Sequence, residues 1–381
     1  MYSSIATPAQ ARVDLAAIRH NVAQLKERAG GAELMGAVKA DAYGHGLLPT
    51  TEAMLQAGAG RLGTAVISEA LALRDGGVTA PILSWLITPG EALDEALTRD
   101  IELSASDVRL LDEIAAAARR TGVTAKTHLE ADTGMSRGGS PPADWPGLLS
   151  RAMELQAEGV IDITGIWSHF ACADIPGHPS IRRQLETFEA ALKLAEQAGA
   201  AGSHVIRHLA NSAALMTLPE ARFDMVRSGI AIYGLSPIPE LGDFGLRQAM
   251  TLVGRVALVK RVPEGSGVSY GHLYVCERET TIAVVPLGYA DGILRHASDR
   301  AEVLAGGRRR RITGRVCMDQ FMIDLGDDEL AAGDEVVLFG PGDGGEPTAQ
   351  EWADTLGTIT HEIVTRIGSR VPRVYERRST E

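Results

Sequence analysis

The sequence predicts an α/β protein with two parts: an N-terminal (β/α)8 barrel of the TIM type and a C-terminal domain that is mostly β. Two observations lead to this prediction. Short apolar runs alternate with amphipathic segments through the first 230 residues, and helical periodicity nearly disappears after about Leu246. Buried parallel strands appear in a sequence as continuous apolar runs, and each connection between them needs a helical crossover.

Eight apolar runs are expected to form the barrel strands. They are Leu34–Lys39, Leu62–Val66, Pro81–Leu86, Ile101–Ser104, Thr124–Glu130, Ile161–Ser168, His204–Ala210 and Phe223–Arg227. Between them, amphipathic helices are expected at positions that include Asn21–Ala29, Glu91–Thr98, Asp107–Arg120 and Pro179–Ala198. A doubly wound sheet is the structural alternative, but eight βα units in this length of chain favour the closed barrel.

The second domain is expected to consist of strands separated by Gly, Asp and Pro turns, with one late helix at Ala349–Leu356. The predicted strands lie within Thr251–Val262, Thr280–Val285, Arg311–Leu325 and Glu335–Phe339. We expect the barrel to occupy residues 12–246 and the β domain residues 247–381, with residues 1–11 able to pack against the second domain. The run Arg308–Arg311, beside two glycines, is interpreted as a solvated hairpin turn rather than as an anion site.

Composition restricts the function. The chain has 381 residues, and its 37 basic and 49 acidic side chains give a net charge of −12, which disfavours nucleic acid and anionic membranes as partners. The longest uncharged stretch, residues 76–90, is too short to cross a bilayer, and no signal peptide is evident. Three widely spaced cysteines argue against a disulfide framework or a zinc site. We therefore expect a soluble, cytoplasmic protein that handles small molecules and binds no metal.

Chemistry-bearing residues follow the predicted strands, where the active sites of TIM barrels lie. Lys39 ends the first apolar run, so partial burial should lower the pKa of its amine and make it nucleophilic. Tyr43 and His45 follow among glycines. Asn211-Ser212 after the seventh run and Gly229 after the eighth suit a phosphate, because helix N-termini and glycine-flanked amides bind anions. A reactive lysine beside a phosphate site suggests pyridoxal phosphate (PLP).

The motifs around these residues resemble those of the alanine racemases, which are fold-type III PLP enzymes, over nearly the whole chain. The matching segments are 38–46 (VKADAYGHG), 132–137 (DTGMSR), 168–170 (SHF), 208–212 (HLANS), 226–234 (VRSGIAIYG), 268–271 (VSYG), 288–292 (GYADG), 314–319 (GRVCMD) and 370–375 (RVPRVY).

The resemblance implies a role for each matching residue. Lys39 is implied to hold PLP covalently and to act as the base on one face of the substrate, and Tyr270 to act as the base on the other face in the partner subunit's site. Arg227 is implied to contact the pyridine nitrogen. A guanidinium only donates hydrogen bonds, so that nitrogen would stay unprotonated, the cofactor would be a weaker electron sink and side reactions would be suppressed. His208 is implied to bond Arg227, and His169 to lie near the pyridine ring.

The remaining positions are implied to hold the phosphate, the substrate carboxylate and the entry channel. The cofactor shell comprises Tyr43, Asn211, Ser212, Gly229, Ile230 and Tyr375; the substrate carboxylate would meet Arg137 and the Met318 amide; and the channel would include Tyr289, Asp174, Arg295 and Arg315. Two positions depart from the family pattern. Glu130 stands where a carbamylated lysine usually holds the arginine, so we expect Glu130 to hold Arg137 instead. His361 stands where an aromatic residue, often Tyr, is usual, and is interpreted as structural.

The leading hypothesis is a homodimeric PLP enzyme with shared active sites that interconverts L- and D-alanine and supplies D-alanine for peptidoglycan. A racemase with broader or serine preference stays open. A non-catalytic PLP-binding barrel is a second hypothesis, disfavoured because such proteins lack the β domain that carries Tyr270. A fold-type III decarboxylase is a third, disfavoured because those enzymes have an acidic residue where this chain has Arg227.

Overall fold

The computed structural model describes residues 7–376 and confirms the closed eight-stranded parallel barrel. Its strands run in the order of the chain, and each coincides with one predicted apolar run. They are β2 (Glu33–Ala37), β3 (Arg61–Thr64), β4 (Ile82–Ser84), β5 (Ile101–Ala105), β6 (Ala125–Glu130), β7 (Ile161–Trp167), β8 (Ile206–His208) and β9 (Met225–Ser228), and β9 closes on β2.

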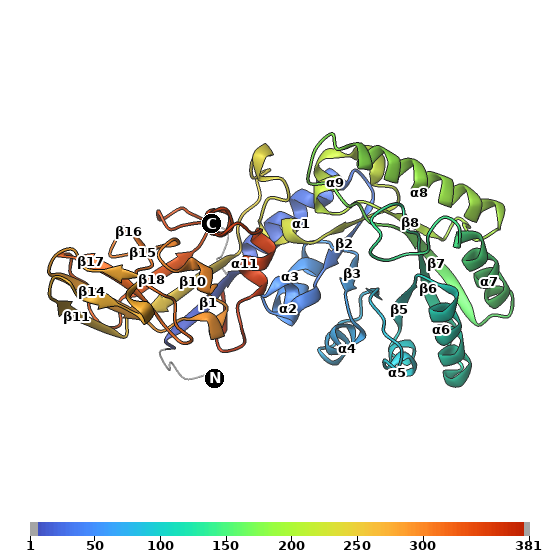
Figure 1. Ribbon diagram of the computed structural model, residues 1–381. Coiled ribbons are helices and arrows are strands. Elements are labelled where there is room, and N and C mark those ends of the chain that lie inside the picture. The colour runs from blue at the N-terminus through green and yellow to red at the C-terminus, as the bar shows by residue number, and fades with distance from the viewer. Residues whose placement is uncertain (1–6, 377–381) are drawn as a thin grey trace.

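Helices surround the barrel, as Figure 1 shows. They are α1 (Leu15–Ala29), α2 (Lys39–Tyr43), α3 (Leu47–Gln56), α4 (Ile67–Asp75), α5 (Leu93–Thr98), α6 (Val108–Thr121), α7 (Trp145–Ala157), α8 (Pro179–Gln197) and α9 (Ser212–Thr217), followed by the short 3₁₀ helix η2 (Ile230–Tyr233). Helix α1 begins six residues before the predicted Asn21, because the Asp14 carboxylate accepts hydrogen bonds from the N–H groups of Ala16 and Ala17 and caps the helix there.

The second domain lies beside the barrel and is mostly β (Figure 1). Its sheets are formed by β10 (Met250–Arg255), β11 (Leu258–Val262), β12 (Gly267–Val268), β13 (Tyr274–Val275), β14 (Thr280–Val285), β15 (Glu302–Ala305), β16 (Arg308–Arg311), β17 (Phe321–Gly326), β18 (Glu335–Phe339) and β19 (Arg373–Glu376). The predicted helix is α10 (Ala349–Leu356), and a second helix, α11 (Thr360–Thr365), follows it.

The first strand of the described residues lies in the sheet of the second domain and not in the barrel. Strand β1 (Ala9–Asp14) pairs antiparallel with β10 and parallel with β19, in a six-stranded sheet of order β16-β15-β18-β10-β1-β19. Of the predicted packing segment 1–11, residues 1–6 lie outside the described residues. The expected barrel range of 12–246 therefore cuts through β1. We propose that all of β1, through Asp14, is counted with residues 247–381 in the second domain, and that the barrel domain comprises residues 15–246.

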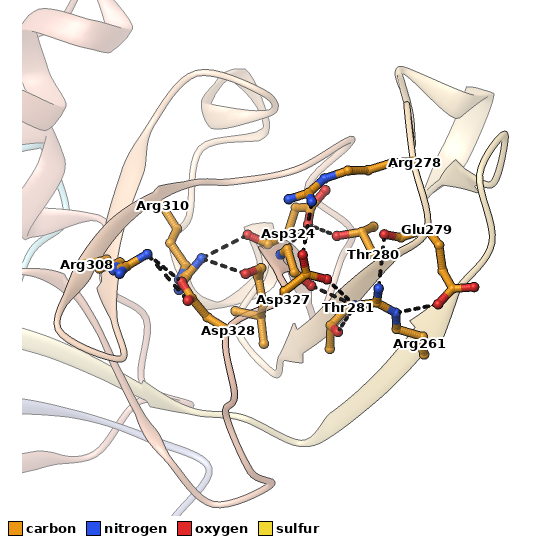
Figure 2. A network of polar contacts seen from close by, with 12 residues as sticks. Arg261, Arg278, Glu279, Thr280, Thr281, Arg308, Arg310, Asp324, Asp327 and Asp328 are labelled. Carbon is orange, nitrogen blue, oxygen red and sulfur yellow. Dashed lines mark hydrogen bonds and ion pairs between the residues drawn. The ribbon is translucent and has the colours of Figure 1, made fainter.

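The interpretation of Arg308–Arg311 as a turn is wrong, because the four arginines form strand β16. The turn is Gly306-Gly307, whose φ angles of 59° and 72° suit glycine, and Ala305 pairs with Arg308 across it. Figure 2 shows Arg308 and Arg310 at the carboxylate of Asp328. The run therefore neutralises acidic residues of the same domain, beside a second group in which Arg261 and Arg278 meet Asp327.

Asn21 joins α1 to the segment that leads into the second domain. Its buried amide donates to the carbonyl oxygens of Ile232 (2.9 Å) and Arg247 (2.8 Å), and its side-chain oxygen accepts from the Arg247 N–H at 2.8 Å. Gly234 lies in the same junction, where a Cβ would come within 1.6 Å of the Arg247 oxygen. The helices of residues 7–376 include none that is long and apolar enough to span a bilayer.

Replacing Asn21 by Leu should lower the free energy of unfolding by about 3 kcal/mol, because three backbone groups at this junction lose their partner. Urea denaturation followed by circular dichroism measures the change. Gln24→Leu, at a partly exposed amide on the same helix, should change stability by less than about 0.5 kcal/mol. Equal stabilities of the two variants would show that the Asn21 bonds do not hold the junction.

Candidate active site

Lys39 follows β2 directly, at the carboxyl ends of the barrel strands, and opens an unusual turn. Residues Ala40 to Tyr43 all have left-handed backbone angles, with φ between 53° and 54°. Such angles are costly for residues other than glycine and need support from the surroundings. Glu69 of α4 supplies part of it, because its carboxylate accepts the Ala40 N–H at 2.6 Å. Gly44 supplies more by close packing, since a Cβ there would lie 2.4 Å from the Val364 oxygen of α11.

The Lys39 amine is set up as a nucleophile. Burial and the nearby charge of Arg137 lower its pKa, and Arg227 acts in the same direction, while Glu69 opposes them. Its nitrogen lies 5.7 Å from the ring centre of Trp85 and 6.0 Å from that of Tyr43. A larger fraction of the amine is therefore neutral near neutral pH than in a free lysine.

Tyr43, Ser212 and Gly229 meet beside Lys39. The Tyr43 ring stacks on Tyr233 at 4.7 Å, and burial raises the pKa of its hydroxyl, which stays protonated. A Cβ at Gly229 would lie 2.3 Å from the Tyr43 oxygen, so glycine creates the space for that hydroxyl. The Ser212 hydroxyl accepts the Gly229 N–H at 2.9 Å.

Three further predicted residues surround this group. Asn211 caps α9 by accepting the Ala214 N–H at 3.0 Å, which fixes the position of Ser212. Ile230 opens η2, so its N–H has no partner inside that helix. The Tyr375 hydroxyl reaches Gly46, where a Cβ would come within 1.9 Å of it. The Tyr43 and Ser212 hydroxyls thus lie together at the Gly229 backbone, an arrangement that suits a phosphate, while the Tyr375 hydroxyl lies against the loop that follows Tyr43.

Arg227 ends β9 and is buried among acceptors. Its Nη1 donates to His208 Nδ1 at 3.0 Å, and its Nη2 donates to the Ser168 oxygen at 2.7 Å and to His169 Nδ1 at 3.0 Å. The guanidinium carbon lies 4.7 Å from the ring centre of Trp167. Burial lowers the pKa of Arg227 to about 9, so it remains a cation at neutral pH. Burial and this charge hold the pKa values of His169 and His208 well below the usual range, so both rings are neutral.

Arg137 lies exposed in the loop after β6. The Asp132 carboxylate accepts the N–H groups of Gly134, Met135 and Ser136 and so shapes this loop. Glu130 is buried, and its two carboxylate oxygens lie 3.1 Å from the position of a Cβ at Gly138, next to the arginine. Within residues 7–376 no direct ion pair joins Glu130 to Arg137, so the two charges interact only at a distance. Burial raises the pKa of Glu130 to about 7, although the charges of Arg227 and Arg137 act to lower it.

A second group of predicted residues lies in the β domain. Tyr270 is 72% exposed and Met318 is 53% exposed. Tyr289 and Met318 are held together, because the N–H groups of Tyr289 and Ala290 donate to the oxygens of Cys317 and Met318. Arg315 lies against Gly271, Arg295 is exposed in a short 3₁₀ helix, and Asp174 is exposed in the loop after β7. The contacts found in residues 7–376 do not bring Tyr270 to Lys39 within one chain.

Sequence reasoning missed several residues of the barrel mouth. His361 on α11, interpreted as structural, has its ring centre 6.0 Å from that of Tyr43, and burial and Lys39 lower its pKa to about 4. Trp85, Trp167 and Glu69 also contact predicted site residues. The positions of Ser84, Trp167 and Ser168 at the ends of β4 and β7 could have indicated some of these residues, because residues at the carboxyl ends of barrel strands face the active site. The described chain holds no group of three or more His, Cys, Asp or Glu side chains placed to bind a metal.

The arrangement fits PLP by its chemistry. The Lys39 amine, with its lowered pKa, can bond to an aldehyde. The protonated Tyr43 hydroxyl can donate to a phosphate, and the absence of a Cβ at Gly229 makes room for this hydroxyl. Arg227 can donate to an aromatic nitrogen but cannot accept from one.

Comparison with known proteins gives matches along both domains of the chain. Residues 13–237 match the family model "Alanine racemase, N-terminal domain", and residues 249–375 match "Alanine racemase, C-terminal domain". The alanine racemase of Frankia casuarinae is 59% identical, covering 95% of each chain, and that of Thermobifida fusca is 55% identical, covering 96% of this chain and 98% of its own.

Solved structures agree. The alanine racemase from D-cycloserine-producing Streptomyces lavendulae has a TM-score of 0.95 and 54% identity, covering 97% of each chain. The enzyme from Streptomyces coelicolor A3(2) has a TM-score of 0.94 and 55% identity, covering 97% of this chain and 98% of its own. By sequence along both domains and by fold, the chain belongs to the alanine racemase family.

Proposed function

We propose that the protein is a PLP-dependent alanine racemase that interconverts L- and D-alanine by a two-base mechanism. The observation that carries this proposal is the pairing of a buried guanidinium, surrounded by acceptors, with a lysine of lowered pKa at the same barrel mouth. The high identity to enzymes named alanine racemase supports the choice of alanine over other amino acids. A broader or serine preference is the alternative within the same chemistry.

Each part of the barrel mouth has a task in this proposal. Lys39 would hold PLP, while Tyr43, Ser212, Ile230 and Tyr375 would hold its phosphate. When bound, PLP supplies the electron-withdrawing ring that makes the Cα proton of the amino acid acidic. Arg227 would donate to the pyridine nitrogen, and because a guanidinium keeps its protons, that nitrogen stays unprotonated. Arg137 and the Met318 N–H would hold the substrate carboxylate.

Proton transfer needs one base on each face of Cα. Lys39 would take or return the proton on one face, and its lowered pKa makes the neutral amine, which is the form that accepts a proton, more accessible than in a free lysine. Tyr270 would serve the other face, but its exposure in its own chain leaves it free to reach another site. We therefore propose a homodimer in which each site receives the partner subunit's Tyr270, with Tyr289, Arg295, Arg315 and Asp174 lining the entry channel.

The cellular setting follows as part of the proposal. Cys172, Cys276 and Cys317 are free thiols, which fits a reducing cytoplasm. D-Alanine made there would serve peptidoglycan synthesis.

Incubation with L-alanine separates the candidate functions. The purified protein should form D-alanine without CO₂, whereas a decarboxylase releases CO₂ and a non-catalytic binder does neither. Borohydride reduction should remove the visible absorbance of bound PLP and leave the label on the Lys39 peptide. Lys126→Ala, at a surface ion pair with Asp100, should be labelled like the wild type, and Lys39→Ala should not be labelled. A colourless protein, or a label on Lys126 or Lys260, would contradict the assignment.

Mixing two inactive variants tests the shared site. Lys39→Ala and Tyr270→Ala chains should each lose nearly all racemase activity alone. After subunit exchange, up to a quarter of the sites contain both an intact Lys39 and an intact Tyr270, because half of the dimers are mixed and each has one such site. Activity should return to that extent. Exchange verified by mass spectrometry without recovered activity would place Tyr270 in its own chain's site or make it dispensable.

Glu130→Gln tests whether this residue holds Arg137. Since the pKa of Glu130 is raised to about 7, its charge is present above pH 7 and lost below it. The wild-type KM for alanine should therefore rise as the pH falls from 8 to 6. The KM of the Gln variant should change less over this range, because it should be roughly ten-fold above the wild-type value of pH 8 at both pH values. Activity should also be independent of bicarbonate. Glu158→Gln, at a surface pair with Arg119, is the matched control. Wild-type kinetics in Glu130→Gln would show that Arg137 is held by other groups.

A further inference from the structure

A chain of hydrogen bonds crosses the barrel interior behind Arg227. From Arg227 Nη1 it passes to His208 Nδ1 at 3.0 Å, from His208 Nε2 to His128 Nδ1 at 2.8 Å, and from His128 Nε2 to Glu102 Oε2 at 2.9 Å. Its members come from β9, β8, β6 and β5 and are all buried. Glu102 is in turn paired with Arg61 of β3, whose Nη1 lies 2.5 Å from the carboxylate. We call Glu102, His128 and His208 the histidine chain.

Arg227 fixes the direction of these bonds from one end. A guanidinium has donors and no acceptor, so His208 Nδ1 must be the acceptor and carries no proton. His208 then has its proton on Nε2 and donates it to His128 Nδ1. For the same reason His128 has its proton on Nε2 and donates to Glu102. Both rings are therefore neutral and share one tautomer, in agreement with burial, which lowers both pKa values.

Glu102 fixes the same direction from the other end. The hydrogen bond from His128 and the charge of Arg61 outweigh the effect of burial and lower the pKa of Glu102, so it is an anion that only accepts. A reversed chain would need a donor at this place. The histidine chain therefore lies between a group that only donates and a group that only accepts.

Packing leaves the histidine rings little freedom to turn. A Cβ on Gly165 of β7 would lie 2.2 Å from His128 Nδ1, so this glycine makes room for the ring. The register of β6 against β7 shifts between Thr127 and His128. Trp167 stacks parallel on His208 with ring centres 5.8 Å apart, and its indole N–H is fixed by the Ser104 hydroxyl at 2.8 Å.

We propose that Glu102 is a positioning residue for Arg227: its acceptor-only carboxylate sets the tautomers of His128 and His208, so that His208 Nδ1 always accepts from the guanidinium. With two of its nitrogens held by His208, Ser168 and His169, Arg227 keeps its remaining N–H groups for the cofactor. This inference rests on the proposed function only where it assigns the remaining N–H groups of Arg227 to the cofactor.

A neutral amide at position 102 would remove the constraint. Glu102→Gln keeps the size of the side chain, but its NH₂ can donate to His128 Nε2. Arg227 alone would then favour the original direction, so a fraction of the molecules could adopt the reversed chain, in which His208 Nδ1–H faces the N–H of Arg227 and the arginine loses that acceptor. Glu102→Asp keeps an acceptor-only anion and should preserve the direction.

Nitrogen NMR of the ¹⁵N-histidine-labelled holoenzyme reads the tautomers directly. We expect both His128 and His208 of the wild type to be neutral with the proton on Nε2. Glu102→Gln should show a mixture of tautomers and a kcat lower by roughly ten-fold with a smaller change in KM. Glu102→Asp should keep the wild-type tautomers and recover part of the activity. Glu33→Gln is the matched control, because Glu33 lies 3.7 Å from Arg61 without contacting either histidine.

The wild-type spectrum alone can overturn the proposal. A proton on Nδ1 of either histidine, or a charged ring, would contradict it even if the Gln variant does not fold. Unchanged tautomers in a folded Glu102→Gln protein would also contradict it, whatever its activity. A protein that has the expected tautomers but neither binds PLP nor racemises alanine would contradict the proposed function and leave the histidine chain standing.

Discussion

The burial of Arg227, a cation that can only donate hydrogen bonds, constrains the barrel mouth more than any other feature. Each group around it has to be an acceptor: the Ser168 oxygen, His169 Nδ1 and His208 Nδ1. These acceptors must be neutral or the site would hold several adjacent positive charges, and burial keeps the histidines neutral. The same charge helps to lower the pKa of Lys39, so the residue that we propose to hold the ring nitrogen also tunes the lysine that we propose as a base.

A second constraint is the left-handed turn that follows Lys39. Four consecutive non-glycine residues in this region are costly, and Glu69 together with α11 of the second domain stabilises them. The β domain therefore contributes to the barrel site within its own chain, through α11 and Tyr375, besides the residues that we propose it offers to a partner. This gives a physical reason for two domains of such different architecture in one enzyme.

Sequence periodicity was sufficient to locate the eight barrel strands because buried parallel strands are apolar throughout. Each predicted run overlaps its strand, although β2, β3, β5 and β9 extend one residue beyond the predicted bounds. It did not assign β1 to the second domain, because membership of a sheet depends on pairing with β10 and β19, more than 230 residues away. Arg308–Arg311 was misinterpreted because exposed arginines are compatible with a turn and with an edge strand. The pairing with β15, which the sequence of the run does not reveal, makes it a strand.

The family motifs led to Lys39, Tyr43, Ser212, Arg227 and Gly229, which the structure brings together at the barrel mouth. They did not reveal Glu102 or His128, because residues that meet inside a barrel come from different strands with no fixed spacing in sequence. Glu130 is a buried carboxylate beside the Arg137 loop, but no direct ion pair joins the two residues within residues 7–376, so the expectation that Glu130 holds Arg137 stays a prediction. Side-chain length explains this, since a glutamate is shorter than a carbamylated lysine.

The protonation state of the cofactor's pyridine nitrogen tests the central claim most directly. The full-length enzyme can be loaded with PLP labelled with ¹⁵N in the ring and examined by NMR between pH 6 and 9. If Arg227 acts as a fixed donor, the signal should be that of an unprotonated, hydrogen-bonded nitrogen throughout this range. A signal of protonated pyridinium would contradict the account, because it would require an acceptor where the structure has a guanidinium.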